Sequence, residues 1–148
     1  MTDVEARGVH GVLDGYTVEV SLTSFVARPL LAGMFVYGGL DAYRNPEGKV
    51  PRAEKVAPDV ASLVGVDADT EQLVQLNGLV QVVAGTTLAF GILPRLSALT
   101  LAASLVPTTL AGHRFWEEDD DGTRAQQTIQ FLKNAGMMGG LLMIIEHG

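Results

Sequence analysis

Charged residues are absent from four stretches of the chain, at residues 29–40, 72–94, 96–112 and 134–145. The stretches are 12, 23, 17 and 12 residues long, so every charged side chain lies in the other 84 positions. A soluble helix carries polar residues on its outer face at a period of about 3.6 residues, and no charge recurs at that period here. A membrane-spanning helix needs about 20 predominantly apolar residues. The pattern therefore favours membrane-spanning helices.

Short extensions turn the four stretches into four predicted helices. The first and the last each need one basic residue, Arg28 and Lys133, whose long side chains can extend to the membrane surface. Pro94 and Arg95 separate the middle two and predict a tight helical hairpin. The alternative is a soluble bundle of very hydrophobic helices. We expect an all-α, integral membrane four-helix bundle with helices over about 24–43, 71–93, 95–112 and 124–146.

The segments outside these helices are polar. Residues 1–23 contain charges but neither the basic start nor the apolar centre of a secretory signal, so they are predicted to form a polar N-terminal tail before a membrane domain over 24–148. Asp69 and Thr70 precede the second helix and are suited to cap it. A run of five acids, residues 117–121, is expected to be a solvated loop.

Small residues recur where membrane helices would need to touch. Gly136 and Gly140 have the spacing of a GxxxG pair, and Gly39, Gly78 and Gly85 lie in the first two predicted helices. Close backbone approach at small residues is a main source of helix association in lipid. These glycines support a closely packed bundle.

Composition excludes several classes of function. The chain has 17 acidic and 10 basic residues and a net charge of -7, which argues against a nucleic-acid partner because phosphate binding needs a basic surface. It has no cysteine, which excludes disulfides, thiolate metal sites and a cysteine nucleophile. Isolated histidines do not make a metal motif, so no metal site is expected. Any redox chemistry must use a bound cofactor or a partner protein.

The basic residues indicate an orientation in the membrane. With four spans, the loops at 41–71 and 112–127, together with nearby Lys133, hold seven basic residues, and the opposite side holds three. Basic loops favour the cytoplasm, so we expect a multi-pass protein of the plasma (inner) membrane with these loops inside. The bias of seven Arg to three Lys is typical of a high-GC organism such as an actinobacterium.

The alternating helix directions predict a polar layer in one half of the bundle. A lysine in an apolar segment costs roughly 3 kcal/mol at the membrane centre, so Asp41 is predicted to be the counter-ion of Lys133. His113 can bind a quinone carbonyl or relay a proton, two roles that histidine often has in proteins. The hypothesis is a site for a small anion or a quinone headgroup, and its candidate residues are Arg28, Tyr37, Asp41, Asn77, His113, Lys133 and Asn134.

Simpler interpretations of the same residues stay open. Lys133 can extend to the membrane surface without a ligand, and Arg28 can anchor on lipid headgroups. The segment 113–116 (His-Arg-Phe-Trp) can be an interfacial anchor. Buried amides such as Asn77 can serve only to link helices by hydrogen bonds.

The sequence resembles the DoxX family of small bacterial and archaeal membrane proteins over about residues 25–146. The resemblance is carried by the segments 28–35 (RPLLAGMF), 77–78 (NG), 91–99 (GILPRLSAL), 113–116 (HRFW) and 131–134 (FLKN), in that order. Arg28, His113, Lys133 and Asn134 match the family pattern. The resemblance implies four membrane helices, in agreement with the predicted layout. The acidic run and the tail look like departures from the pattern.

The resemblance also implies a function. The family is named for a subunit of an archaeal thiosulfate:quinone oxidoreductase, and some mycobacterial members are associated with a membrane complex of oxidative-stress defence. We expect a small subunit or accessory of a quinone-linked redox complex, in contact with the lipid bilayer and with partner proteins. Whether the chain is itself an enzyme or a homo-oligomer stays open. The alternatives are a non-catalytic scaffold for partner proteins and a small-solute or anion transporter around Lys133 and Arg28.

Overall fold

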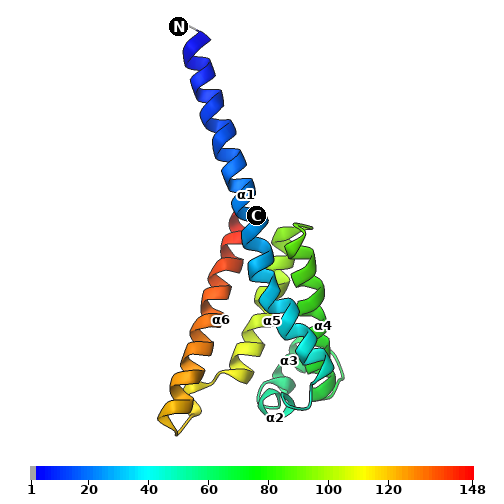
Figure 1. Ribbon diagram of the computed structural model, residues 1–148. Helices are drawn as coiled ribbons and strands as arrows, with labels where there is room; N and C mark the ends of the chain where they lie inside the picture. Colours follow the sequence, from blue (N-terminus) through cyan, green and yellow to red (C-terminus); the bar gives the residue numbers. More distant parts are fainter. Residues whose placement is uncertain (1–2) are drawn as a thin grey trace.

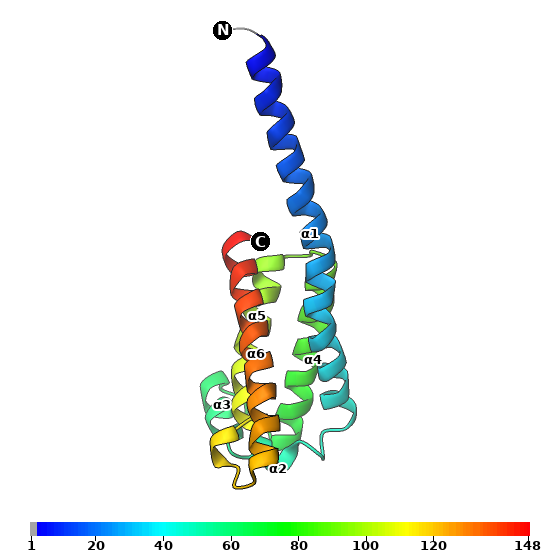
Figure 2. The same ribbon diagram turned by 60° about the vertical axis from the view of Figure 1, so that its left-hand side comes forward.

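The chain folds into helices throughout the residues that the structure describes. This computed structural model describes the backbone of residues 3–148 and the side chains of residues 22–148. Four long helices lie side by side (Figure 1, Figure 2): α1 (Asp3–Arg44), α4 (Thr70–Ala89), α5 (Pro94–Gly112) and α6 (Asp121–His147). The short helices α2 (Val50–Ala53) and α3 (Ala57–Val64) and the 3-10 turn η1 (Phe115–Glu117) lie at one end of the bundle. The prediction of an all-α chain is confirmed for the described part.

Each long helix packs along the next one in the chain. The most extensive pairing is between α1 and α4, followed by α5 with α6 and α4 with α5. The core cluster draws on every long helix, and its fully buried large side chains are Phe35, Leu88, Leu101 and Leu141. Leu31 of α1 approaches Gly140 of α6, so the first and last helices also meet near one end.

Two facing glycines bring α1 and α4 together. A Cβ atom on Gly39 would lie 2.5 Å from the carbonyl oxygen of Gly78, and one on Gly78 would lie 2.6 Å from the carbonyl oxygen of Gly39. Only glycine permits such an approach of two backbones. A Cβ on Gly136 of the predicted GxxxG pair would meet nothing within 4 Å. The closest approach therefore uses Gly39 and Gly78, while Gly136 is open.

The turn between α4 and α5 begins earlier than predicted. Helix α4 ends at Ala89, four residues before the expected residue 93. Gly91 has a φ of +69°, and the amides of Gly91 and Ile92 donate to the carbonyls of Leu88 and Thr87. This is a Schellman ending, which needs a left-handed residue that glycine supplies without strain. The glycine three residues before Pro94 was the available signal.

The predicted cap of the second long helix is confirmed. The Asp69 carboxylate accepts from the amide of Gln72 at 2.8 Å, and the Gln72 side chain accepts from the amide of Asp69 at 3.2 Å. This reciprocal pair satisfies two backbone donors at the start of α4.

Helix α1 begins at Asp3, so the backbone has no helix boundary at the expected division near residue 24. Pro29 was expected in the first turns of the helix and lies inside α1. No proline precedes it that would stop the helix. All five charged side chains of the predicted polar tail lie outside the residues whose side chains are described.

Large apolar side chains face outward on all four long helices. Exposed examples are Phe25 and Leu30 on α1, Leu79 and Val83 on α4, Leu96 and Leu99 on α5, and Ile129, Leu132 and Met143 on α6. Among the described residues one helix, α6, is long and apolar enough by itself to cross a membrane. Helices α4 and α5 carry amides and hydroxyls that lower their hydropathy, and many of these groups bind one another between the helices.

Candidate functional site

A cavity of about 360 Å³ lies at the end of the bundle that holds α2 and α3. Its walls come from the end of α1, the two short helices, the first half of α4 and the last turns of α5. Most of the wall is apolar, with Val56, Val60, Leu73, Val74 and Pro107 among its residues. Its polar residues are Asp41, Lys49, Arg52, Thr70, Asn77, Gln81, Thr108 and His113. Ligand sites are commonly cavities of this size with a few polar groups in an apolar wall.

An interhelical hydrogen-bond network supplies the inner polar part of this wall. Asn77 Nδ2 donates to Thr108 Oγ1 at 3.0 Å, and Ser104 Oγ donates to Asn77 Oδ1 at 2.8 Å. Gln81 Nε2 donates to the hydroxyls of Ser104 and Thr108 at 2.9 and 3.2 Å. Gln81 and Ser104 are buried. The network holds α4 to α5 and positions the two amides that reach the cavity.

His113 closes the cavity at the end of α5. Its Nδ1 lies 2.9 Å from Oε1 of Gln127 on α6, where Gln127 is buried. An amide oxygen only accepts, so Nδ1 carries a proton and donates. The pairing orients the imidazole from the neighbouring helix.

An ion pair lies at the solvent side of the cavity. Lys49 Nζ lies 2.6 Å from Asp41 Oδ2, and Asn45 Nδ2 donates to Asp41 Oδ1 at 2.9 Å. The predicted pairing of Asp41 with Lys133 is therefore wrong. Lys49 lies in the loop directly after α1 and reaches Asp41 by folding back, whereas Lys133 belongs to α6, which does not contribute to the cavity.

The remaining predicted site residues lie outside the cavity. Lys133 is exposed on α6 and donates to Gln130 at 2.7 Å, one turn nearer the loop end of its helix. Asn134 is buried and donates to Thr109 at 3.0 Å between α5 and α6. Tyr37 is 78% exposed on α1. The structure thus gathers Asp41, Asn77 and His113, and places the other candidates elsewhere.

Arg28 lies at the opposite end of the bundle from the cavity. Its Nη1 lies 3.1 Å from the position of a Cβ on Gly91, in the turn between α4 and α5. Arg28 and Lys133 are on different helices, and neither lines the cavity or the groove described below. A binding site around these two residues stays a prediction.

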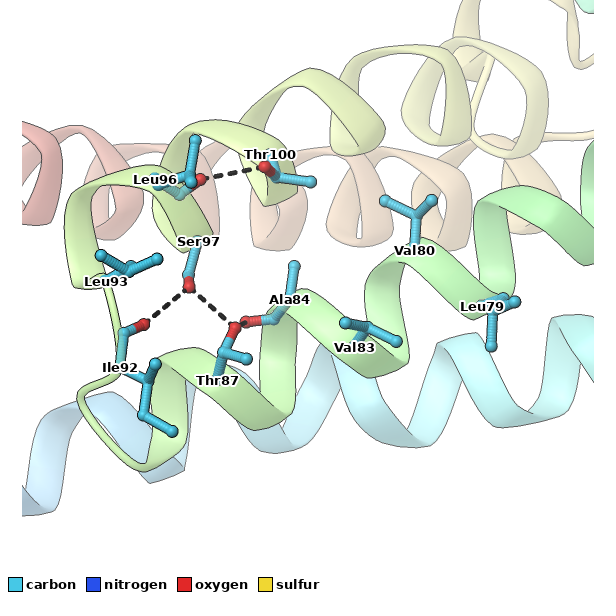
Figure 3. Close-up of a pocket in the computed structure, with 10 residues that line it drawn as sticks. All are labelled: Leu79, Val80, Val83, Ala84, Thr87, Ile92, Leu93, Leu96, Ser97 and Thr100. Carbon is cyan, nitrogen blue, oxygen red and sulfur yellow. Dashed lines mark hydrogen bonds between the residues drawn. The ribbon is translucent and has the colours of Figure 1, made fainter.

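A second hollow, an open groove of about 420 Å³ between α4 and α5, is almost entirely apolar (Figure 3). Its few hydroxyls are already hydrogen-bonded to protein groups: Thr87 Oγ1 of α4 lies 2.8 Å from Ser97 Oγ of α5, and Thr100 donates to the carbonyl of Leu96 within α5 at 2.9 Å. The groove faces outward among exposed side chains such as Val83 and Leu96. It offers no group that would orient a polar ligand, so the cavity at the loop end is the better candidate.

The acidic run is partly structural. The Asp120 carboxylate accepts from the amide of Thr123 at 2.8 Å and caps α6, and this hydrogen bond holds the pKa of Asp120 below its usual range. Glu117 pairs with Lys55, before α3, and with Arg114. These partners, Lys55 first, lower the pKa of Glu117. Among the described residues, no group of three or more His, Asp or Glu side chains could hold a metal ion.

Sequence reasoning left Gln81 and the basic residues Lys49 and Arg52 off its candidate list. Gln81 lies four residues after Asn77, so its place on the same face of α4 was readable from helical spacing. Lys49 and Arg52 were assigned to a loop, and no sequence signal showed that α2 and α3 fold over the bundle end. Their place in the cavity depends on that fold.

Comparison with known proteins agrees with the sequence resemblance. A family model described as DoxX matches residues 23–114, which is more than half of the chain. Every residue of the cavity lies inside the matched segment, whereas Lys133 and Asn134 lie beyond it. Neither a curated protein nor a solved structure matches the chain.

Proposed function

Since the chain belongs to the DoxX family, whose members are membrane proteins, we propose that it crosses the membrane with four helices and serves as a small accessory subunit of a quinone-linked redox complex. In this proposal the cavity at the loop end binds the quinone ring. The main observation in favour of a quinone is the wall of this cavity, where apolar side chains surround the polar groups of Asn77, Gln81 and His113.

The distribution of polarity supports four spans. Outward faces of all four long helices carry exposed large apolar residues, while buried amides and hydroxyls bind one another between helices. Water-soluble proteins rarely expose large contiguous apolar surfaces. In lipid, this arrangement exposes what lipid solvates and satisfies polar groups inside. Lys133, the charged residue nearest the middle of α6, extends toward Gln130 and the loop end, as a lysine does when it reaches for the membrane surface.

The chemistry of the wall supports a quinone. A quinone has an apolar ring with oxygen atoms at its edge, and a ring of this kind needs an apolar pocket with a few directed hydrogen-bonding groups. Asn77, Gln81 and His113 supply such groups, each held by a neighbouring helix. The chain has no cysteine for sulfur transfer, which favours an accessory role over direct sulfur chemistry.

Binding of a short-tailed benzoquinone to the full chain in lipid nanodiscs tests this proposal. The variant His113→Leu should weaken binding about tenfold, because a directed hydrogen bond between the protein and the ring is lost. His147→Leu, an exposed histidine outside the cavity, is the matched control and should bind as the wild type does. Lys133→Met tests the rival location on α6 and should leave binding unchanged.

Absence of quinone binding to the wild type, or loss of binding only in Lys133→Met, would contradict the proposed site. The accessory role is tested on the same protein isolated from native membranes in mild detergent. We expect quinone-dependent redox activity to accompany the isolated protein and to be absent from the chain made alone.

A further inference from the structure

An arginine without a partner lies beside the end of the apolar groove between α4 and α5. We infer that this groove holds an acyl chain of a phospholipid and that Arg28 binds the anionic headgroup of the same lipid. The inference goes beyond the quinone site and rests only on the four membrane spans of the proposed function. It follows from the wall of the groove, its length, the surroundings of Arg28 and the charges at this end of the bundle.

The wall of the groove combines small buried residues with large exposed ones. Ala84 and Ser97 line it and are buried, whereas Val83 and Leu96 line it and are exposed (Figure 3). The hydroxyl of Ser97 is already bound, since it lies 2.8 Å from Thr87 Oγ1 and donates to the carbonyl of Ile92 at 3.1 Å. Such a wall suits a hydrocarbon chain, which has no polar group that needs a partner.

The length of the groove matches one leaflet of a bilayer. From Leu79 to Thr87 its α4 wall extends about 12 Å, at 1.5 Å per residue, and it ends at Ile92 and Leu93 in the turn. The hydrocarbon core is about 30 Å thick, so one leaflet is roughly 15 Å deep. A lipid tail that enters at the turn reaches this depth, whereas a membrane-spanning partner helix would extend well past Leu79. The length therefore favours a lipid over a second copy or a partner helix.

Arg28 lies where the headgroup of such a lipid would be. Its Nη1 lies 3.1 Å from the position of a Cβ on Gly91, the residue directly before Ile92 at the groove end. Arg28 is half-buried, and it makes neither a hydrogen bond nor an ion pair with any residue that the structure describes. A guanidinium has only donors and keeps its charge, so it needs an acceptor. Phosphate oxygens match it in pairs, with strong charge-assisted hydrogen bonds.

The other described charges at this end favour a headgroup with a net negative charge. Arg95 is exposed at the start of α5 and donates to the backbone carbonyl of Glu146 at 3.3 Å, which does not neutralise it. The Glu146 carboxylate lies 3.4 Å from Nε2 of His147 and forms no described salt bridge with either arginine. Basic residues near a membrane surface attract anionic lipids. A zwitterionic headgroup would bring a second positive charge to the two arginines.

Native mass spectrometry of the delipidated full chain tests this inference with two lipids that have the same acyl chains, phosphatidylglycerol and phosphatidylcholine. We expect one phosphatidylglycerol to bind at least about fivefold more tightly than phosphatidylcholine, which is the contribution of one basic residue at a membrane surface. Glycerol phosphate, a charged headgroup without tails, should not displace the lipid at the same concentration. Equal affinities of the two lipids, or displacement by glycerol phosphate, would overturn the inference.

Variants of Arg28 locate the headgroup contact. Arg28→Gln removes the charge and should bring the two affinities to within about twofold of each other. Arg28→Lys keeps the charge and should keep a preference for phosphatidylglycerol. Arg44→Gln is the matched control and should leave the ratio unchanged, because Arg44 is an exposed arginine of the same helix at the loop end. A wild-type ratio in Arg28→Gln would contradict the assigned contact.

A variant that fills the groove locates the tail. Thr100→Phe adds a ring to the groove and should weaken both lipids about tenfold, the effect of removing about two methylene groups from contact. Leu99→Phe adds a ring at the neighbouring, exposed position outside the groove and should bind lipid as the wild type does. If Thr100→Phe changes the oligomeric state and leaves lipid binding intact, the groove holds a second copy and the inference is overturned.

Quinone binding to the same variants in nanodiscs separates this inference from the proposed function. Arg28 and Thr100 lie outside the cavity, so their variants should bind benzoquinone as the wild type does. A wild type that binds quinone and shows no lipid preference would leave the proposed function standing and overturn the inference. A lipid preference that depends on Arg28, in a chain that binds no quinone, would support the inference and contradict the quinone site.

Discussion

Gly39 and Gly78 determine how closely α1 and α4 approach. Each glycine lies against the backbone carbonyl of the other, where a methyl group would overlap an oxygen that cannot move without its helix. The same contact places Asp41 and Ala42 of α1 beside the start of α4, where they line the cavity. Adding one methyl group at Gly39 or Gly78 is therefore expected to change both the stability of the protein and the shape of the cavity.

Gly39→Ala should destabilise the protein by about 1–3 kcal/mol, the usual cost of overpacking. The inserted Cβ would lie 2.5 Å from the Gly78 carbonyl oxygen, so the helices must separate. Gly136→Ala is the matched control, since its Cβ meets nothing within 4 Å, and should be neutral or slightly stabilising. Reversible unfolding in mixed micelles measures both, and equal stabilities would contradict the close approach.

At the scale of elements, the segment from α2 to α3 is held over the bundle end by side-chain pairs at two points. Lys49 pairs with Asp41 of α1, and Lys55 pairs with Glu117 of η1. Both pairs are exposed, and exposed pairs contribute little to global stability. Their expected role is local, because they keep α2 and α3 against the cavity.

The Glu117 pair should make this segment sensitive to acid. The pKa of Glu117 is lowered by Lys55 and then by Arg114, so the contribution of the pair is fully present above the ordinary carboxyl pKa of 4.5. It is lost as the pH falls through the lowered pKa of the folded state. A spin label at position 63, where the native Leu63 is 87% exposed on α3, should become more mobile over that pH range.

Glu117→Gln should give the same increase in mobility at neutral pH, because the amide has no charge to pair with Lys55. Glu118→Gln is the control, since the described contacts of Glu118 with Arg124 use its backbone carbonyl. A label whose mobility is unaffected by acid and by Glu117→Gln would show that this pair does not hold the segment.

At the scale of the whole molecule, the bundle has its apolar surface outside and much of its side-chain polarity inside or at the ends. One end of the bundle holds the turn after α4, the end of α6, Arg28 and Arg95. At this end, Arg95 donates to the backbone carbonyl of Glu146. The segments around α2, α3 and η1 share the other end and most of the basic residues. The bundle therefore has two chemically different ends, suited to two sides of a membrane.

Thiol labelling of intact bacterial cells tests this topology, because the chain has no native cysteine. Single cysteines at Gly48 and Asp119 should be protected from an impermeant maleimide, and those at Arg95 and His147 should react, because basic loops remain in the cytoplasm. The reverse pattern would invert the orientation. Labelling of Gly48 and Arg95 from the same side would contradict the four spans.

Much of the fold could be predicted because long helices follow from local sequence patterns. Charge-free stretches placed the four long helices, the Asp69 cap was readable from the residue types at the start of α4, and Pro94 placed the start of α5. Gly91 also indicated the early end of α4, although the predicted helix continued to residue 93. The contact between Gly39 and Gly78 could not be predicted, because the sequence shows where the glycines lie along each helix but not which of them face a neighbouring helix.

The sequence by itself determined the all-helical architecture and three members of the candidate site, Asp41, Asn77 and His113. Tertiary structure decided the rest. It paired Asp41 with Lys49 in place of Lys133, since the loop after α1 folds back to Asp41 while α6 contributes no residue to the cavity wall. It also sets the orientation of the Gln81 amide. The hydroxyls of Ser104 and Thr108 on α5 donate their hydrogens to other acceptors, so Gln81 presents its N–H groups to them. Which polar atoms remain free is a property of the assembled network, and no single helix carries it.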